Sequence, residues 1–320
     1  MTTTEPAKKK PDLPGSEDVN RVMGIKEWVL ILILSIIWGG SFFFIGVTVR
    51  EMTPLTIVMF RVTIASIILL IIVHFKKERM PSSPNILGAF LIMGALFNVI
   101  PFSLIVWGQT HIESGLASIL NATTPIFSVI LAHLLTREER LTGNRVAGVL
   151  IGWLGVTVLI GIESLRGFGI EVIGQIAVLG ASLCYAFGAI YGRRFKNMST
   201  LVVAAGMLCS SSVMITPLAL FIERPWHLSP GVLTLLALFG LAAISTSLAY
   251  LIYFRILAVA GPTNSLLVTF LVPINAIFLG YLILGERLGW NAFVGMGIIF
   301  LGLAAIDGRL IKVFKRKEKG

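Results

Sequence analysis

The sequence contains few charged residues. They make up 13% of its 320 positions, whereas hydrophobic residues make up 56%, and no lysine occurs between Lys77 and Lys196. In soluble domains roughly a quarter of the residues are charged. This scarcity, together with a mean hydropathy of +0.91, excludes an ordinary soluble domain and predicts a protein that lies in a membrane.

Side chains for metal binding or acid–base chemistry are also scarce. The chain has two cysteines and four histidines, and no Asp or Glu lies in the middle of an apolar segment. The histidines lack the spacing of metal ligands, and a membrane enzyme would need a cluster of acids, bases, nucleophiles or metal ligands. We therefore predict no catalytic residue, no metal site and no cofactor, and an enzyme is the poorer interpretation.

Charged residues, prolines and glycines interrupt the apolar sequence at regular intervals. A helix that crosses about 30 Å of hydrocarbon needs about 20 residues. The pattern predicts an all-α integral membrane protein with ten transmembrane helices, of which the fifth and tenth are short and rich in glycine, as suits close helix contact. The predicted spans are 28–48, 54–75, 86–107, 114–135, 146–162, 170–191, 201–222, 232–254, 262–284 and 290–306.

The distribution of Lys and Arg predicts the orientation, because short loops rich in these residues stay in the cytoplasm. With the N-terminus inside, the predicted outer segments hold only Arg50, Arg166, Arg224 and Arg287, and the inner segments hold nearly all the other cations. Both termini are therefore predicted to be cytoplasmic. The net charge of +10 is spread over separate loops and matches no nucleic-acid-binding module, so we predict no nucleic-acid partner.

The two halves of the chain repeat each other. Pro125 matches Pro273 at an offset of 148, and Glu139-Arg140-Leu141 matches Glu286-Arg287-Leu288 at an offset of 147. Since each half holds an odd number of spans, the second enters the membrane from the opposite side, which makes an inverted repeat. The predicted organisation is an N-terminal tail at 1–26, a first repeat at 27–162, a second repeat at 163–306 and a basic tail at 307–320.

Several motifs carry a family resemblance: "WGGSF" in the first span, "FRVTIAS" in the second, and a proline followed by "ERL" near the end of the fourth and ninth spans. On these motifs the chain resembles the EamA type of the drug/metabolite transporter superfamily, over about residues 27–306. The resemblance implies a ten-helix carrier in the bacterial inner membrane. It also implies a central cavity between the halves, and often the export of amino acids or other small metabolites.

Polar and aromatic side chains recur at helical spacing within the spans. Polar groups in hydrocarbon are costly and usually face the bundle interior or a wet cavity, although Ser and Thr also join helices without a cavity. We predict that these stripes line a substrate cavity, and Trp38 is equally compatible with a packing role. The candidate residues are Trp38, Phe42, Asn98, Phe102, Asn121, Tyr185, Thr246, Tyr250, Tyr253, Ser265 and Thr269.

Arg61 and two prolines are further candidates. Arg61 is the one strong cation deep within a predicted span, so it should meet carbonyls, a cavity, or a carboxylate such as Glu51 or Glu113. It either anchors the helices or contacts a substrate carboxylate. Pro125 and Pro273 are predicted to kink their helices, as mobile hinges or as fixed bends.

The sequence thus favours a secondary transporter that works by alternating access and exports amino acids or related amphipathic solutes. A channel or facilitator for small solutes remains an alternative, as does a carrier of phosphorylated or nucleotide-like metabolites, for which few cations are available. The predicted partners are a small-molecule substrate, a coupling proton as the candidate ion, and membrane lipid, with a monomer or homodimer as the assembly.

Overall fold

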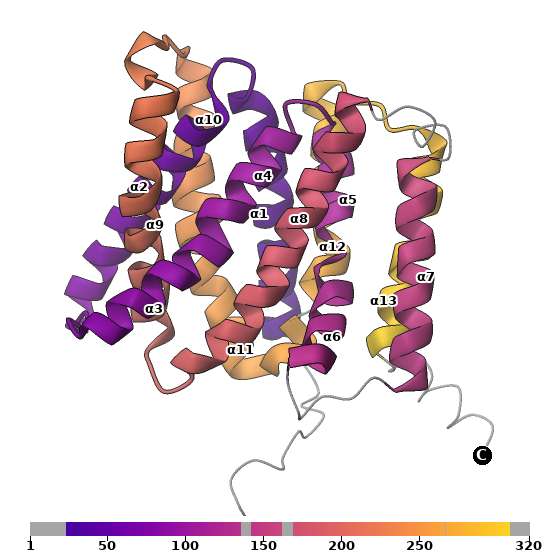
Figure 1. Ribbon diagram of the computed structural model, residues 1–320, viewed down its shortest axis with the longest axis horizontal. Helices are drawn as coiled ribbons and strands as arrows, with labels where there is room; N and C mark the ends of the chain where they lie inside the picture. The colour runs from indigo at the N-terminus through magenta and orange to yellow at the C-terminus, as the bar shows by residue number, and fades with distance from the viewer. Residues whose placement is uncertain (1–23, 136–141, 162–168, 266, 308–320) are drawn as a thin grey trace, which may run out of the picture.

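The computed structural model describes residues 24–135, 142–161, 169–265 and 267–307. Within these residues ten helices or helix pairs are long and apolar enough to cross a membrane, which confirms the predicted spans. Figure 1 shows them as one bundle of upright helices. The motif at Glu139, the predicted outer residue Arg166 and most of both tails (1–23 and 308–320) lie outside the described residues.

The first half supplies five spans, two of which are interrupted. The third span consists of α3, a π-helical turn at Ala95–Val99 and α4, and the fourth span breaks at residues 122–123 between α5 and α6. The helices are α1 (Ile25–Thr48), α2 (Pro54–Phe75), α3 (Pro84–Gly94), α4 (Ile100–Gly108), α5 (Ser114–Asn121), α6 (Thr124–Leu135) and α7 (Gly143–Ile160).

The second half supplies the other five spans. A π-helical turn at Ala243–Leu248 separates α10 from α11, and another at Gly280–Leu284 follows α12. The helices are α8 (Ile170–Gly192), α9 (Thr200–Ile222), α10 (Val232–Ala242), α11 (Ala249–Ser265), α12 (Leu267–Leu279) and α13 (Trp290–Asp307).

One predicted boundary differs from the structure. The sequence predicted that the eighth span ends at 254 and the ninth begins at 262, whereas α11 remains helical through to Ser265. The pair Gly261-Pro262 favours a break in a sequence pattern. Proline removes only one backbone hydrogen bond from a helix, so the backbone here continues past the pair.

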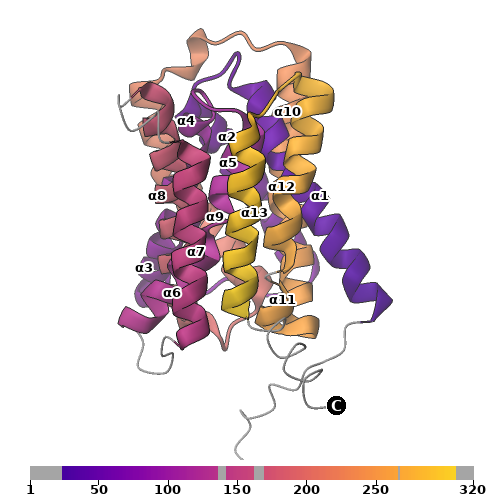
Figure 2. The same cartoon turned by 90° about the vertical axis from the view of Figure 1, so that its right-hand side faces the viewer.

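Helices α7 and α13 lie side by side at one edge of the bundle (Figures 1 and 2). A Cβ atom on Gly148 would lie 2.5 Å from the carbonyl oxygen of Gly302, and one on Gly155 would lie 2.9 Å from that of Gly295. Only glycine permits backbones to approach so closely. Because Gly148 corresponds to Gly295 in the repeat and Gly155 to Gly302, each contact is the symmetry mate of the other, as expected where two inverted repeats meet.

Three carboxylates join the halves at one end of the bundle, which we call the outer end because its loops (49–53, 109–113, 223–231 and 285–289) are those predicted to be external. Glu51 accepts hydrogen bonds from Gly231 N and Thr234 Oγ1, both at 2.7 Å, at the start of α10. Glu223 accepts from the backbone nitrogens of Leu55 and Thr56 at the start of α2, at 3.0 and 2.7 Å. Each carboxylate satisfies the free N–H groups of a helix in the opposite half.

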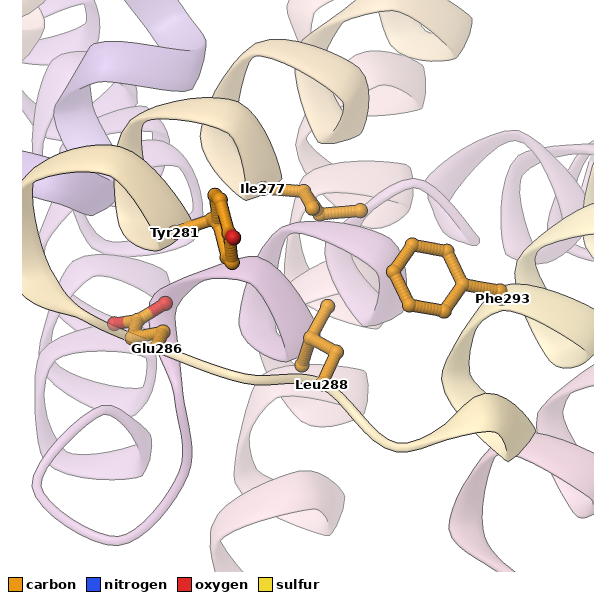
Figure 3. A pocket seen from close by; sticks show the side chains of 5 residues that line it. All are labelled: Ile277, Tyr281, Glu286, Leu288 and Phe293. Carbon is orange, nitrogen blue, oxygen red and sulfur yellow. The ribbon is translucent and has the colours of Figure 1, made fainter.

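Glu286 makes the third of these connections, to the start of α5. It accepts from Ser114 N at 3.0 Å, Ser114 Oγ at 2.7 Å and Gly115 N at 3.3 Å. Figure 3 shows Glu286 in the loop after α12, beside a small cavity of about 80 Å³ that Leu288 and Phe293 help to line. The "ERL" motif of the second half therefore fixes the first turn of the fourth span.

Candidate functional site

Two of the candidate site residues lie on π-helical turns in equivalent places of the two halves. Ala95–Val99 in the third span and Ala243–Leu248 in the eighth are related by the repeat offset of 148 residues. Such turns widen a helix locally and occur often at functional sites. One turn carries Asn98 and the other carries Thr246, and each of these side chains reaches into a helix of the opposite half.

Asn98 lies at the centre of a fully buried hydrogen-bond network. Its Nδ2 donates to Ser211 Oγ at 3.0 Å, and its Oδ1 accepts from the hydroxyl of Tyr250 at 2.8 Å. Ser211 Oγ in turn donates to the carbonyl of Met207 at 2.6 Å. The network joins the π-helical turn before α4 to α9 and α11, and each polar side-chain atom named here has a hydrogen-bond partner. Ser211, on α9, is not among the residues predicted from the sequence.

Arg61 on α2 contacts the other π-helical turn, and only 5% of its surface is exposed. Its Nε donates to Thr246 Oγ1 at 2.9 Å, and its guanidinium carbon lies 3.5 Å from the centre of the Phe102 ring, a cation–π contact. Among the described residues none accepts a hydrogen bond from the terminal nitrogens Nη1 and Nη2, and no carboxylate pairs with the guanidinium.

The two carboxylates considered as partners of Arg61 are engaged elsewhere. Glu51 caps α10, and Glu113 accepts a hydrogen bond from the backbone N–H of Arg287 at 3.3 Å. Burial raises the pKa of Glu113, which lies in the loop before α5, and the hydrogen bond from Arg287 opposes that rise. Arg61 is thus a buried cation whose charge none of the described acidic groups neutralises.

Three of the predicted aromatic residues are related to this cation or to Asn98. Phe102 contacts the guanidinium, and Tyr185 and Tyr250 both lie within electrostatic range of it. Tyr250 also bonds Asn98. Elsewhere in the bundle the rings of Trp38 and Tyr253 are 5.4 Å apart, and the ring of Phe97 is 5.7 Å from that of Tyr185.

The remaining candidates are placed differently. Phe42 is buried in the apolar core, where its carbonyl accepts from Gln109 Nε2 at 2.9 Å. Asn121 ends α5, beside the break in the fourth span. Thr269 is half-buried on α12, and the side chain of Ser265 lies outside the described residues. A substrate-lining role for each of these stays a prediction.

The matched prolines differ in their local structure. Pro125 is the second residue of α6, directly after the break at 122–123, whereas Pro273 lies inside the continuous helix α12. Proline is well tolerated in the first turn of a helix, where its missing N–H has no partner to lose. In the middle of α12 it removes a hydrogen bond. Their role as kinks stays a prediction, and the equivalence seen in sequence does not extend to backbone conformation.

The fold is that of a multi-pass α-helical membrane protein built from an inverted repeat around a buried polar centre. The pattern of the EamA-like transporter family matches the chain twice, at residues 25–161 and 172–306. The chain therefore belongs to the EamA-like transporter family, and it is a membrane transporter.

Relatives and a solved structure support this assignment. The chain is 27% identical over 290 residues to a probable amino-acid metabolite efflux pump of Escherichia coli K12, which covers 88% of this chain and 94% of that protein. It is 22% identical over 280 residues to the uncharacterized transporter YoaV of Bacillus subtilis, covering 87% and 96%. A crystal structure with 19% identity has a TM-score of 0.64 over 88% of this chain and 96% of that one, which indicates a shared fold.

Proposed function

We propose that the protein is a secondary transporter that exports amino acids or related amphipathic solutes by alternating access, with both termini in the cytoplasm. The observation that carries this proposal is the free end of Arg61. A buried guanidinium with two unengaged terminal nitrogens is suited to a carboxylate, which it can bind through two parallel hydrogen bonds. In this proposal the substrate carboxylate supplies the missing negative charge.

The hydrogen bonding around the two π-helical turns differs. Asn98 on one turn reaches Ser211, and Thr246 on the other reaches Arg61. These contacts are not symmetry mates, because at the repeat offset of 148 Ser211 corresponds to Thr63 and Arg61 to Cys209. The arrangement around Asn98 is neutral and fully hydrogen-bonded, whereas the one around Arg61 carries an unpaired charge, which is costly when buried. A ligand that supplies the opposite charge would remove this cost.

The surroundings of Arg61 favour an amphipathic cargo with a single carboxylate. The rings of Phe102, Tyr185 and Tyr250 offer apolar surface beside the guanidinium. A phosphate group would call for several cations, and Arg61 is the one Lys or Arg buried within the described spans. The name of the E. coli relative, a probable amino-acid metabolite efflux pump, agrees with this choice of cargo.

Counterflow in proteoliposomes tests the proposal. Vesicles loaded with an unlabelled hydrophobic amino acid should take up the labelled one in a saturable way, which a channel does not do. Arg61→Gln should reduce counterflow at least about tenfold, because a charged hydrogen-bonded pair is worth roughly 1.5–3 kcal/mol. Arg61→Lys keeps the charge but loses the two parallel N–H donors of the guanidinium, so its counterflow should lie between those of the wild type and Arg61→Gln.

The melting temperature of each variant separates the two roles of Arg61. Arg61→Gln protein that folds as well as the wild type but does not transport supports contact with the substrate. Protein that folds and transports normally would show that Arg61 is not part of the site. Arg61→Gln protein that does not fold, with Arg61→Lys fully active, would assign the residue to anchoring.

A further inference from the structure

The fourth span contains a buried side-chain atom without a hydrogen-bond partner, one of five among the described residues. Helix α5 ends at Asn121, and α6 begins only at Thr124. No described residue donates a hydrogen bond to Asn121 Oδ1, which is shielded from solvent. Buried polar atoms in folded proteins are nearly always hydrogen-bonded, so this amide oxygen marks a place for a donor that is not part of the described chain.

The surroundings of Asn121 are rich in acceptors. The carbonyls at the end of α5 point toward the break, and the negative end of the helix dipole lies there. Thr123 Oγ1 donates to the carbonyl of Leu120 at 2.6 Å, and Thr124 Oγ1 donates to that of Asn121 at 2.8 Å. Ser182 of α8 also reaches both carbonyls, at 3.2 and 3.4 Å. The protein's own hydroxyls thus engage the backbone oxygens and leave the side-chain oxygen of Asn121 open.

Helix α8 connects this acceptor with the Arg61 site. Ser182 touches the end of α5, and Tyr185, which lies within electrostatic range of Arg61, follows it three residues later. Residues three apart share a helix face and are separated by about 5 Å along the axis. The free acceptor and the free donor therefore both neighbour residues of the same turn of α8, one beside Ser182 and the other near Tyr185.

We propose that Asn121 Oδ1 accepts a hydrogen bond from the ammonium group of the substrate while Arg61 binds its carboxylate. The site then recognises a free α-amino acid by both of its charged ends. This inference rests on the proposed function, since it takes Arg61 to be the carboxylate end. It adds a requirement for a free amino group, with the aromatic side chains left to contact the rest of the cargo.

An unpaired acceptor at Asn121 would make the site specific for a cargo with an amino group. A cargo with an ammonium group satisfies Asn121 Oδ1, whereas the corresponding deaminated acid leaves it buried and unpaired. Sites built to bond a polar group reject analogues that lack it much more strongly than they distinguish apolar groups of different size. We expect at least a tenfold preference for the amino acid over its deaminated analogue.

Paired ligands test the inference in purified protein. Each hydrophobic L-amino acid is compared with its deaminated acid, for example L-phenylalanine with 3-phenylpropionate, and both affinities are measured by calorimetry. Wild type should prefer the amino acid at least about tenfold. Asn121→Leu should bring the ratio near one by weakening the amino acid alone, and Asn121→Asp, which keeps an acceptor oxygen, should retain the preference.

The same measurements separate this inference from the proposed function. If Arg61→Gln abolishes binding of both ligands while Asn121→Leu leaves the ratio unchanged, the carboxylate site stands and the role of Asn121 is refuted. If the wild type binds both ligands equally, or binds neither, the amino-group requirement is also refuted. The melting temperature without ligand monitors folding, and Asn121→Ala, which also removes the acceptor, replaces Asn121→Leu if the latter does not fold.

Discussion

Removal of the Glu286 side chain tests the contact between the two halves at the outer end. The carboxylate holds three donors at the start of α5, at 3.0, 2.7 and 3.3 Å. Hydrogen bonds to charged groups contribute about 1.5–3 kcal/mol each when buried, but loss of a helix cap costs only about 0.5–2 kcal/mol because water replaces part of it. At the partly exposed edge of the bundle we expect Glu286→Ala to lower the free energy of unfolding by about 2 kcal/mol.

A thermal unfolding series in detergent measures this effect. With an unfolding entropy of about 2.1 cal/mol/K per residue, a loss of about 2 kcal/mol lowers the melting temperature of this 320-residue chain by about 3 °C. Glu286→Gln, which keeps one acceptor oxygen and loses the charge, should show about half of that. Glu171→Ala is the matched control. Glu171 is exposed in the first turn of α8, and its replacement removes the same charge near the start of a helix. If Glu286→Ala and Glu171→Ala melt together, the carboxylate does not join the halves as the geometry indicates.

Three further predictions concern the helix contacts and the outer loops. Gly302→Ala should lower the free energy of unfolding by about 1–3 kcal/mol, because its Cβ would lie 2.6 Å from Gly152 N; Gly297→Ala on the same helix, with nothing within 4 Å, should be neutral or stabilising in the same denaturant titration. Tyr250→Phe should cost about 1–2 kcal/mol, since it leaves Asn98 Oδ1 buried without its donor, and unchanged stability would contradict the network. The hydrogen bonds from Gly231 and Thr234 lower the pKa of Glu51 in the folded protein. Its contribution to stability is therefore present above the pKa of the unfolded state and is lost as the pH falls through the pKa of the folded state. Glu51→Gln should make the melting temperature depend less on pH on the acid side, and an unaltered pH profile would refute this.

Much of the architecture could be predicted from the sequence, because membrane spans follow from the length of apolar segments and from the position of charges. The two glycine-rich spans and the repeat offset were also predicted from the sequence. The close approaches of Gly148 to Gly302 and of Gly155 to Gly295 agree with both. The course of α11 past residue 254 was not predicted, since a Gly-Pro pair signals a break only by local preference.

The candidate site was predictable in part. Polar residues in hydrocarbon are rare enough to stand out, so Arg61, Asn98, Thr246 and Tyr250 could be selected from the sequence, and the structure brings them to one region. Ser211 was overlooked because a serine in a membrane helix gives no signal of its own partner. Of the alternatives predicted for Arg61, pairing with Glu51 or Glu113 does not occur, because both carboxylates bond the backbone at the outer end.

The sequence by itself determined that this chain crosses a membrane ten times as two inverted halves, because hydropathy, charge and repeat spacing are properties of segments taken one at a time. Only the tertiary structure decided which polar groups are satisfied. Whether Arg61 keeps its terminal nitrogens free and Asn121 its amide oxygen depends on side chains that come from distant helices. Hydrogen bonding is a relation between such groups, and it is set when the two halves pack together.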